Sequence, residues 1–481
     1  MGSRNYLPLS STAIHLSRLN KAALSSVGPS IIIRPMTTTT ATLAALRSGE
    51  LKGITRLDLA CDLQEFPPEI FELADSLEVL NLSGNALSAL PDDLSRLSKL
   101  RVIFCSDNRF TQLPEVLSSC LQLEMVGFKA NRIREVAATA ISPGLRWLIL
   151  TDNQISALPD AIGSCTRLQK LMLAGNQLAV LPEAMRGCVG LELLRISANR
   201  FEALPQWLLH LPRLTWLAFG GNPVSTAPHA PSPAVARLQW ADLVLGEKLG
   251  EGASGVIHKA HWQRSPQQAA HPVAVKLFKG AVTSDGFPAE EMAACLAAGN
   301  HAHLIGVIGE VSGHPAGSSG LVMPWVDPEF RNLAGPPNLA SCTRDIYADG
   351  QRFSLPLVLD LAKGLAAAGE HLHARGISHG DFYAHNVLYR PEGGCFLGDF
   401  GAASFYPAPD HGDPNPFEAL EVRAFGCLLG ELLERLEPES EPELDVRLPS
   451  LNALQLRCVA PVAASRPRFA ELVASLESLR P

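Results

Sequence analysis

Two short segments in the C-terminal half of the chain combine acidic and amide side chains in a pattern suited to phosphoryl transfer. The first, HGDFYAHN, contains Asp381 and Asn386, and the second, FLGDFGA, contains Asp399, eighteen residues after Asp381. Phosphoryl transfer needs such groups on rigid loops, because the protein must align the phosphate donor with the acceptor and neutralise spreading negative charge. The order and spacing of these three residues satisfy that requirement.

The two segments resemble the catalytic and metal-binding loops of protein kinases. The resemblance implies that Asp381 orients the attacking hydroxyl, while Asp399 and Asn386 bind the Mg²⁺ that accompanies ATP. ATP and Mg²⁺ are therefore the expected cofactors, and the expected reaction is transfer of the γ-phosphate to a protein hydroxyl, with Ser or Thr as the expected acceptor.

A glycine-rich segment, LGEGASGV, followed by the segment VAVK, extends the resemblance toward the N-terminus. Glycine allows a backbone to approach phosphate groups closely, and in protein kinases such a loop covers the ATP phosphates. Lys276 of VAVK is expected to pair the phosphates with Glu291, or with Glu290 if the helix register differs by one residue. The residues expected to line the nucleotide site are Leu249, Gly250, Gly252, Gly255, Ile257, Ala274, Lys276, Met323, Trp325 and Val326.

Two later segments continue the same order of motifs. The segment GLVMPWV resembles the strand and hinge that hold adenine, with Met323 in the gatekeeper position and Pro324 where an acidic residue is usual. The segment CVAPVAASRPRF resembles the late region of tyrosine-kinase-like and related kinases, so Arg466 is the expected buried partner of an acidic residue that closes the activation segment. The resemblance covers nearly all of residues 240–481 and implies a bilobal α+β protein kinase fold.

Three departures from the kinase pattern concern the catalytic loop and the segment that follows it. Gly380 replaces the arginine that reads an activation-loop phosphate in regulated kinases, so control by that switch is not expected. Ala408, Pro409 and Asp410 give the best match to the motif that closes the activation segment, which makes this segment only about twelve residues long. Tyr383 stands where Ser/Thr kinases usually have a lysine.

Two other functions remain open at this point. HGDxxxxN also resembles the aminoglycoside and choline phosphotransferases, which would imply a small-molecule acceptor, although the glycine loop, VAVK, DFG and the late CxxxPxxxRP segment favour a protein kinase. A pseudokinase scaffold that senses nucleotide is favoured by Tyr383, Pro324 and the short activation segment. The presence of every expected metal and phosphate ligand favours an active enzyme instead.

The first half of the chain repeats with a period of 22 or 23 residues, which indicates a solenoid. The repeats resemble the leucine-rich-repeat family, as in LEVLNLSGNALSALPDDLSRLSK, and an asparagine recurs at a fixed position in seven of the eight units. Such asparagines satisfy turn amides that would otherwise lack partners. The eight repeats start at Ile54, Leu77, Leu100, Leu123, Leu145, Leu168, Leu191 and Leu214. The expected fold is therefore multidomain, with an α/β leucine-rich-repeat solenoid before the kinase.

The concave face of the solenoid is expected to carry apolar side chains, because those beside the central strand leucine point away from the core. Large exposed apolar surfaces are rare on free monomers, so a protein substrate or regulator is expected there. The strongest contact candidates are Trp147, Trp216, Phe104 and Met125. An alternative is that this face docks on the chain's own kinase domain and inhibits it.

Composition limits the remaining possibilities. The net charge is −8 without a strong basic cluster, which argues against a nucleic-acid partner, and no apolar run is long enough for a transmembrane helix. Residues 1–35 are basic, Ser-rich and free of acidic residues, so they are either an extension before a start at Met36 or a transit peptide. The expected location is cytoplasmic, or mitochondrial or plastid if a transit peptide is present. The expected domains are residues 36–53 as a cap, 54–222 as repeats, 223–239 as a linker and 240–481 as the kinase.

Overall fold

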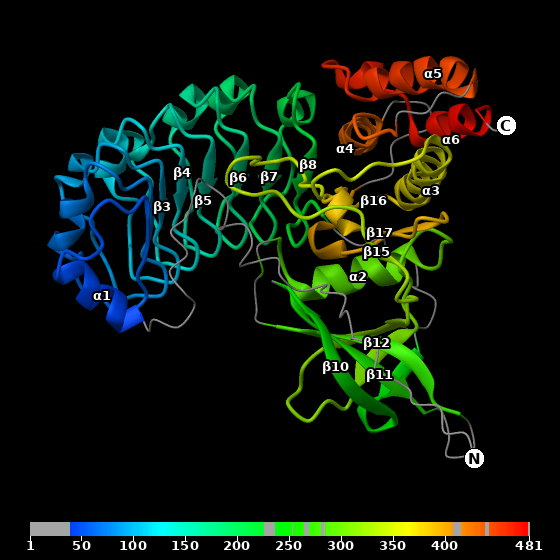
Figure 1. Ribbon diagram of the computed structural model, residues 1–481, viewed down its shortest axis with the longest axis horizontal. Coiled ribbons are helices and arrows are strands. Elements are labelled where there is room, and N and C mark those ends of the chain that lie inside the picture. The colour runs from blue at the N-terminus through cyan, green and yellow to red at the C-terminus, as the bar shows by residue number, and fades with distance from the viewer. Residues whose placement is uncertain are drawn as a thin grey trace, which may run out of the picture.

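The computed structural model describes residues 39–225, 236–252, 254–263, 269–279, 283, 285–406, 415–437 and 442–479 (Figure 1). The expectations for residues 1–35, for most of the linker and for Ala408, Pro409 and Asp410 lie outside the described residues.

The N-terminal half is a curved solenoid that begins with helix α1 (Thr39–Arg47) and continues as a parallel sheet (Figure 1). Each repeat adds one three-residue strand, because only the central leucine and its two neighbours lie in the ladder. The strands pair in the order β1-β2-β3-β4-β5-β6-β7-β8, and this confirms the predicted solenoid. Their bounds are β1 Arg56–Asp58, β2 Val79–Asn81, β3 Val102–Phe104, β4 Met125–Gly127, β5 Trp147–Ile149, β6 Lys170–Met172, β7 Leu193–Arg195 and β8 Trp216–Ala218.

The recurring asparagines hold adjacent repeats together through backbone hydrogen bonds. Asn85 accepts from the amides of Cys61 and Leu63 at 3.0 Å each and donates to the carbonyls of Leu59 and Leu82 at 2.8 Å each. One side chain thus satisfies four backbone groups of two repeats, as the sequence predicted. Most repeats then run through a short 3-10 helix on the convex side. These helices are Pro68–Leu73, Leu94–Arg96, Glu115–Ser119, Ala138–Ala140, Asp160–Ser164, Glu183–Gly187 and Gln206–His210.

The kinase-like half begins with a six-stranded sheet in the order β10-β11-β12-β14-β13-β9, with helix α2 beside it. Strand β9 falls within the segment that the sequence assigned to the linker, and it pairs in parallel with β13. Helix α2 starts at a proline and ends before Gly299, whose positive φ of 65° suits glycine. The bounds are β9 Ala236–Gln239, β10 Leu243–Glu251, β11 Gly255–Trp262, β12 His271–Phe278, α2 Pro288–Ala298, β13 Gly309–Ser312 and β14 Gly320–Pro324.

The second lobe is mainly helical, and small sheets carry its loops. Helix α3 is capped by Ser354, and helix α4 is capped by Asn415, whose side chain accepts from the amide of Phe417 at 3.0 Å. The two-lobed arrangement confirms the predicted kinase fold. The bounds are β15 Arg331–Asn332, α3 Leu355–His373, β16 Ile377–Ser378, β17 Val387–Tyr389, β18 Cys395–Leu397, β19 Ser404–Phe405, α4 Pro416–Leu433, α5 Pro442–Cys458 and α6 Phe469–Glu477.

The solenoid and the kinase half are packed together rather than separated. The last repeats lie against the catalytic lobe, and the segment between β15 and α3 runs across strands of the solenoid sheet (Figure 1). Tyr406 and Leu420 of the kinase half belong to the solenoid core, whereas Leu193 and Trp216 of the solenoid belong to the core of the second lobe. The two halves therefore share apolar cores.

The apolar concave face is covered by the chain itself. Trp147, Met125 and Trp216 are buried and Phe104 is half-buried, so they are not the open partner surface that the sequence suggested. Leu339, together with Cys342, packs into the same cluster as Trp147 and Met125. Burying apolar side chains away from water is favourable, and a segment of the kinase half provides this burial in place of a separate partner.

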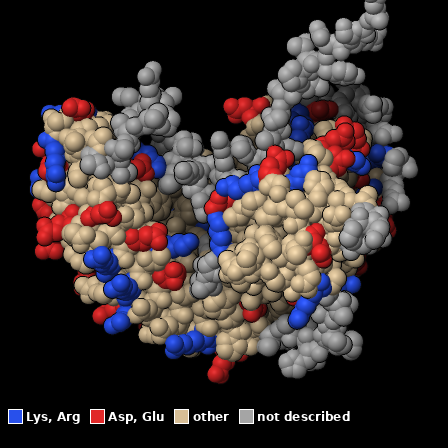
Figure 2. Space-filling model, turned by 90° about the horizontal axis from the view of Figure 1, so that it is seen from below, with Lys and Arg blue, Asp and Glu red and all other residues tan. Residues whose placement is uncertain are grey.

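Charge on the face seen from below is mixed. Lys and Arg alternate with Asp and Glu over the solenoid and over the kinase half (Figure 2). This agrees with the overall charge of −8 and gives no extended basic surface on that face. Among the described helices, none is long and apolar enough to cross a membrane.

Candidate active site

The phosphate side of the site is built by β12 and α2. Lys276 lies on β12, and its Nζ forms a buried ion pair with Glu291 of α2 and lies 3.9 Å from Oδ1 of Asp399. Burial alone would lower the pKa of Lys276, but the carboxylates of Glu291 and Asp399 together raise it, so the amine stays charged. Glu290, the alternative partner, is not bonded to Lys276 in the described structure.

The glycine-rich loop joins β10 to β11 above this pair. The amide of Gly252 donates to the carbonyl of Gly255 at 2.9 Å, which closes the tip of the loop. A Cβ at Gly255 would lie 2.4 Å from the carbonyl oxygen of Leu277, so only glycine fits that position. A Cβ at Gly252 would meet nothing within 4 Å, so its backbone borders open space.

The residues expected around adenine lie along β10, β11, β12 and β14. Ala274 pairs with Met323 across β12 and β14, and Gly250 pairs with Ile257 across β10 and β11. Trp325, which follows β14, is half-buried, and Nζ of Lys259 lies 4.7 Å from its ring centre. Leu249 and Val326 are also half-buried. The predicted nucleotide residues therefore lie on neighbouring strands of one sheet and in the segment that follows β14.

Buried polar groups of α3 and α4 hold the loop that contains Asp381. Glu421 of α4 accepts from the amide of Gly380 at 2.5 Å and from the hydroxyl of Ser378 at 3.0 Å, and it contacts Nε2 of His373 at 2.8 Å. Burial alone would raise the pKa of Glu421, but the bond to His373 and other contacts lower it, so the carboxylate stays ionised. His379 joins the two loops of the site: Nε2 contacts the carbonyl of Gly398 at 3.0 Å.

Asp381 is held at both carboxylate oxygens. Nδ2 of Asn386 donates to Oδ2 at 2.9 Å, and a guanidinium nitrogen of Arg195 donates to Oδ1. Burial alone would raise the pKa of Asp381, but Arg195, followed by His385 and His379, lowers it. Asp381 is therefore an ionised hydrogen-bond acceptor and a weak base.

The residues expected to hold Mg²⁺ fit that role by their chemistry. Asp399 has a side chain 44% exposed and a left-handed backbone with φ of 59°, and its Oδ1 accepts from the amide of Gly401 at 3.2 Å. The amide nitrogen of Asn386 is used to hold Asp381, so its amide oxygen is the remaining ligand atom. One carboxylate and one amide oxygen suit an ion that takes its other ligands from phosphate and water.

His385 and Asp345 form a second polar pair beside Asp381. Nδ1 of His385 lies 2.7 Å from Oδ1 of Asp345, and Nε2 of His385 lies 3.9 Å from Oδ2 of Asp381. Burial alone would lower the pKa of His385, but Asp345, together with Asp381 and Asp399, raises it. Asp345 belongs to the segment that crosses the concave face, so this segment contacts both the solenoid and the catalytic loop.

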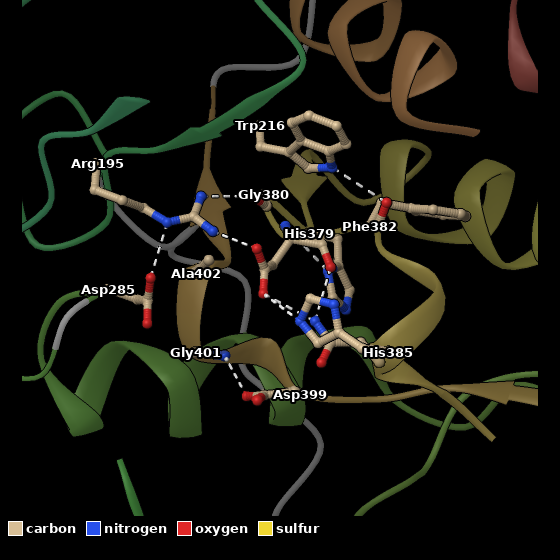
Figure 3. A network of polar contacts seen from close by, with 12 residues as sticks. Arg195, Trp216, Asp285, His379, Gly380, Phe382, His385, Asp399, Gly401 and Ala402 are labelled. Carbon is tan, nitrogen blue, oxygen red and sulfur yellow. Dashed lines mark hydrogen bonds and ion pairs between the residues drawn. The ribbon is translucent and has the colours of Figure 1, made fainter. Parts of the chain in front are cut away.

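The solenoid contributes two side chains that the sequence analysis did not assign to the site. Arg195 of β7 also bonds the carbonyl of Gly380 at 2.7 Å and Oδ1 of Asp285 at 2.8 Å, and Trp216 of β8 donates to the carbonyl of Phe382 at 3.2 Å (Figure 3). The sequence contained one indication that Arg195 is unusual. At the position of Arg195 in neighbouring repeats stand apolar residues, among them Phe104, Ile149 and Met172. A lone arginine in such a row is unusual.

Two of the departures from the kinase pattern, Gly380 and Tyr383, lie against the solenoid. The ring of Tyr383 stacks on Trp216 with centres 4.1 Å apart, and its buried hydroxyl has no hydrogen-bond partner among the described residues. Arg466 bonds the carbonyls of Ala460, Ala419 and Pro212. One of these carbonyl groups, that of Pro212, belongs to the solenoid. The expected acidic partner closes the activation segment, where the best match is Asp410, and it lies outside the described residues.

Comparisons with known proteins agree with this architecture. Residues 243–413 match the family described as protein tyrosine and serine/threonine kinase, and residues 76–97 match leucine rich repeat. The chain is 26% identical over 284 residues to Activated Cdc42 kinase Ack of Drosophila melanogaster, covering 50% of this chain and 25% of that protein. It is 25% identical over 206 residues to cyclin-dependent kinase C-2 C of Arabidopsis thaliana, covering 39% of this chain and 30% of that protein.

The fold, the order of the site residues and these matches define the class of the molecule. The chain carries a leucine-rich-repeat solenoid followed by a protein kinase domain, within which residues 243–413 match the protein tyrosine and serine/threonine kinase model.

Proposed function

We propose that this chain is an active protein kinase that transfers the γ-phosphate of ATP to Ser or Thr hydroxyls of protein substrates. The observation that carries the proposal is the ion pair of Lys276 with Glu291, formed beside Asp399 and facing the loop of Asp381 and Asn386. In protein kinases this pair and the metal-binding aspartate must both be in place for transfer.

Each residue has a defined part in the proposed reaction. Lys276 orients the phosphates of bound ATP, and Glu291 keeps its amine charged and directed. Bound Mg²⁺, which Asp399 and Asn386 would hold, neutralises charge on the phosphates. Asp381 accepts a hydrogen bond from the acceptor hydroxyl and orients it. Its lowered pKa is compatible with this role, since positioning and charge stabilisation dominate phosphoryl transfer.

Incorporation of phosphate from γ-labelled ATP by the full chain tests this function. Asp381→Asn should lose incorporation while ATP binding, measured by calorimetry, stays within about twofold of wild type, because the side chain does not contact Lys276. Phosphosite mapping of generic protein acceptors separates Ser and Thr from Tyr. Equal loss of binding and transfer would contradict the role of Asp381, and products on tyrosine alone would contradict the acceptor class.

One alternative has specific support. The contact of Arg195 with Asp381 and the burial of Tyr383 under Trp216 would also suit a nucleotide-sensing scaffold without transferase activity. That function predicts ATP binding with no incorporation into any acceptor, including the chain itself. The same experiment therefore separates the two.

A further inference from the structure

We propose that Arg195 of the solenoid is a positioning residue of the kinase active site, which fixes the carboxylate of Asp381 from outside the kinase domain. The inference rests on the proposed kinase function and deepens it. In this arrangement the last repeats of the solenoid complete the catalytic loop, and they neither recruit the substrate nor inhibit the enzyme.

The guanidinium of Arg195 is fully engaged at the junction of three segments. Nε donates to Asp285, Nη1 to the carbonyl of Gly380 and Nη2 to Oδ1 of Asp381, and the side chain is only 3% exposed (Figure 3). Because a guanidinium group is planar and rigid, it loses little conformational entropy for each hydrogen bond it forms, and it fixes the orientation of its partners. With Asn386 on the other oxygen, the plane of the Asp381 carboxylate is fixed.

This contact leaves Asp381 able to accept a substrate hydroxyl. Each carboxylate oxygen can accept two hydrogen bonds; Oδ1 accepts one from Arg195 and Oδ2 accepts one from Asn386. The side chain of Asp381 is 20% exposed, so one edge of the carboxylate faces outward. Arg195 thus constrains the acceptor group without enclosing it.

The glycine in the catalytic loop and the arginine of the solenoid belong to one arrangement. Gly380 has φ of 70°, and a Cβ there would lie 2.4 Å from the carbonyl oxygen of Ala402 and 2.9 Å from that of Leu217 on β8. Any side chain at position 380 would therefore strike the docked solenoid. The loop has no arginine of its own at this point, and Arg195 bonds the backbone carbonyl of the same residue.

The docked solenoid is also compatible with an assembled phosphate site. It contacts the start of α2: a Cβ at Gly221 would lie 2.7 Å from the ring of Phe287, and a Cβ at Gly286 would lie 2.9 Å from Ser197. These contacts accompany an intact ion pair of Lys276 with Glu291. Inhibition through this helix would require the pair to be broken, since its position controls activity.

The interface is built into the fold. The amide of Phe219 donates to the hydroxyl of Ser404 at 2.9 Å, and the rings of Phe219 and Phe417 stack with centres 5.2 Å apart. Arg466 donates to carbonyl groups on both sides of the junction, Pro212 of the solenoid and Ala419 of α4. With two shared apolar cores, these contacts describe a permanent junction, so Arg195 is present during turnover.

The test is steady-state kinetics of the full chain with Arg195→Met, Arg195→Lys and Arg195→Ala, beside Arg132→Met as an exposed control on the same solenoid. Arg195→Met should lower kcat at least tenfold while KM for ATP changes little, with all variants assayed well below their melting temperatures. Arg195→Lys should recover part of kcat, and added methylguanidinium should raise kcat of Arg195→Ala several-fold. The control should match wild type.

Three results would overturn the proposal. A kcat of Arg195→Met equal to wild type would mean that the contact does not contribute to catalysis, and a higher kcat would mean that it is inhibitory. A loss shared between kcat and KM for ATP, without rescue by lysine or methylguanidinium, would make Arg195 a structural residue only. A wild-type chain that binds ATP without transferring phosphate would overturn the proposed function as well, and this outcome is distinct from failure of Arg195 alone.

Discussion

At the scale of single residues, the site depends on buried charges whose partners determine their state. Burial opposes the charge of both groups, but Glu291 and Asp399 together keep Lys276 charged, and Arg195 with the neighbouring histidines keeps Asp381 ionised. A buried charge without its partner is costly, so removal of one member affects the other. A variant that removes one member of a buried pair is therefore best compared with a variant at a nearby residue that has no such partner.

Glu291→Gln should weaken the orientation of Lys276, whereas Glu290→Gln should have little effect because Glu290 is not bonded to it. A hydrogen bond between charged groups contributes about 1.5–3 kcal/mol, so kcat/KM for ATP should fall roughly 10–100-fold in Glu291→Gln. Kinetics of both variants at one protein concentration measure the difference. A larger loss in Glu290→Gln would mean that the helix register in solution differs from the structure.

The half-buried Glu431 predicts a pH dependence of stability. Burial, and then the charge of Asp345, raise its pKa to about 8, although Arg344 opposes this. Because the folded pKa lies above the unfolded value near 4.5, its contribution is fully present below about pH 4.5 and is lost as pH rises through 8. Glu431→Gln should therefore raise the melting temperature by a few degrees at pH 8.5 and change it little at pH 5. An equal shift at both pH values would contradict the raised pKa.

At the scale of secondary-structure elements, the sequence predicted repeats and motifs well because both are local patterns. The strand period, the asparagine ladder and the order of VAVK, HGD and DFG each depend on neighbouring residues. The function of Arg195 was not predictable in this way, because its partners Gly380 and Asp381 lie 185 and 186 positions later. For the same reason the sequence could raise docking of the concave face on the kinase half only as an alternative, and it could not identify Leu339 and Cys342 as the residues that cover Trp147.

The junction between β8 and the catalytic loop can be tested at Gly380. Gly380→Ala and Gly299→Ala both place a side chain on a backbone with positive φ, 70° and 65°, which costs about 1–2 kcal/mol. Only Gly380 is also in close contact with other backbone, so the free energy of unfolding should fall roughly 1–3 kcal/mol more in Gly380→Ala than in Gly299→Ala. Gly380→Ala should also lose activity. Denaturant unfolding of both proteins gives the comparison. Equal losses would show that the solenoid does not approach the loop this closely.

At the scale of the whole molecule, the solenoid and kinase act as one folding unit. Deleting residues 1–225 would uncover Phe417, Tyr406 and Leu420 and would remove one hydrogen-bond partner each from Ser404 and Arg466. The fragment should therefore aggregate, or melt well below the intact chain, and should show no gain in activity. Light scattering, thermal melts and phosphate incorporation measure this. A soluble, stable fragment with raised activity would favour the inhibitory alternative.

The central claim is that this chain is a kinase whose catalytic loop is completed by its own repeats. Its most direct measurement is phosphate incorporation from γ-labelled ATP with Mg²⁺ by the full chain, by Asp381→Asn and by Arg195→Met in parallel. The account predicts robust incorporation by wild type, none by Asp381→Asn and at least tenfold less by Arg195→Met, with ATP binding retained in all three. Incorporation that rises in Arg195→Met, or that is absent from wild type despite ATP binding, would contradict it.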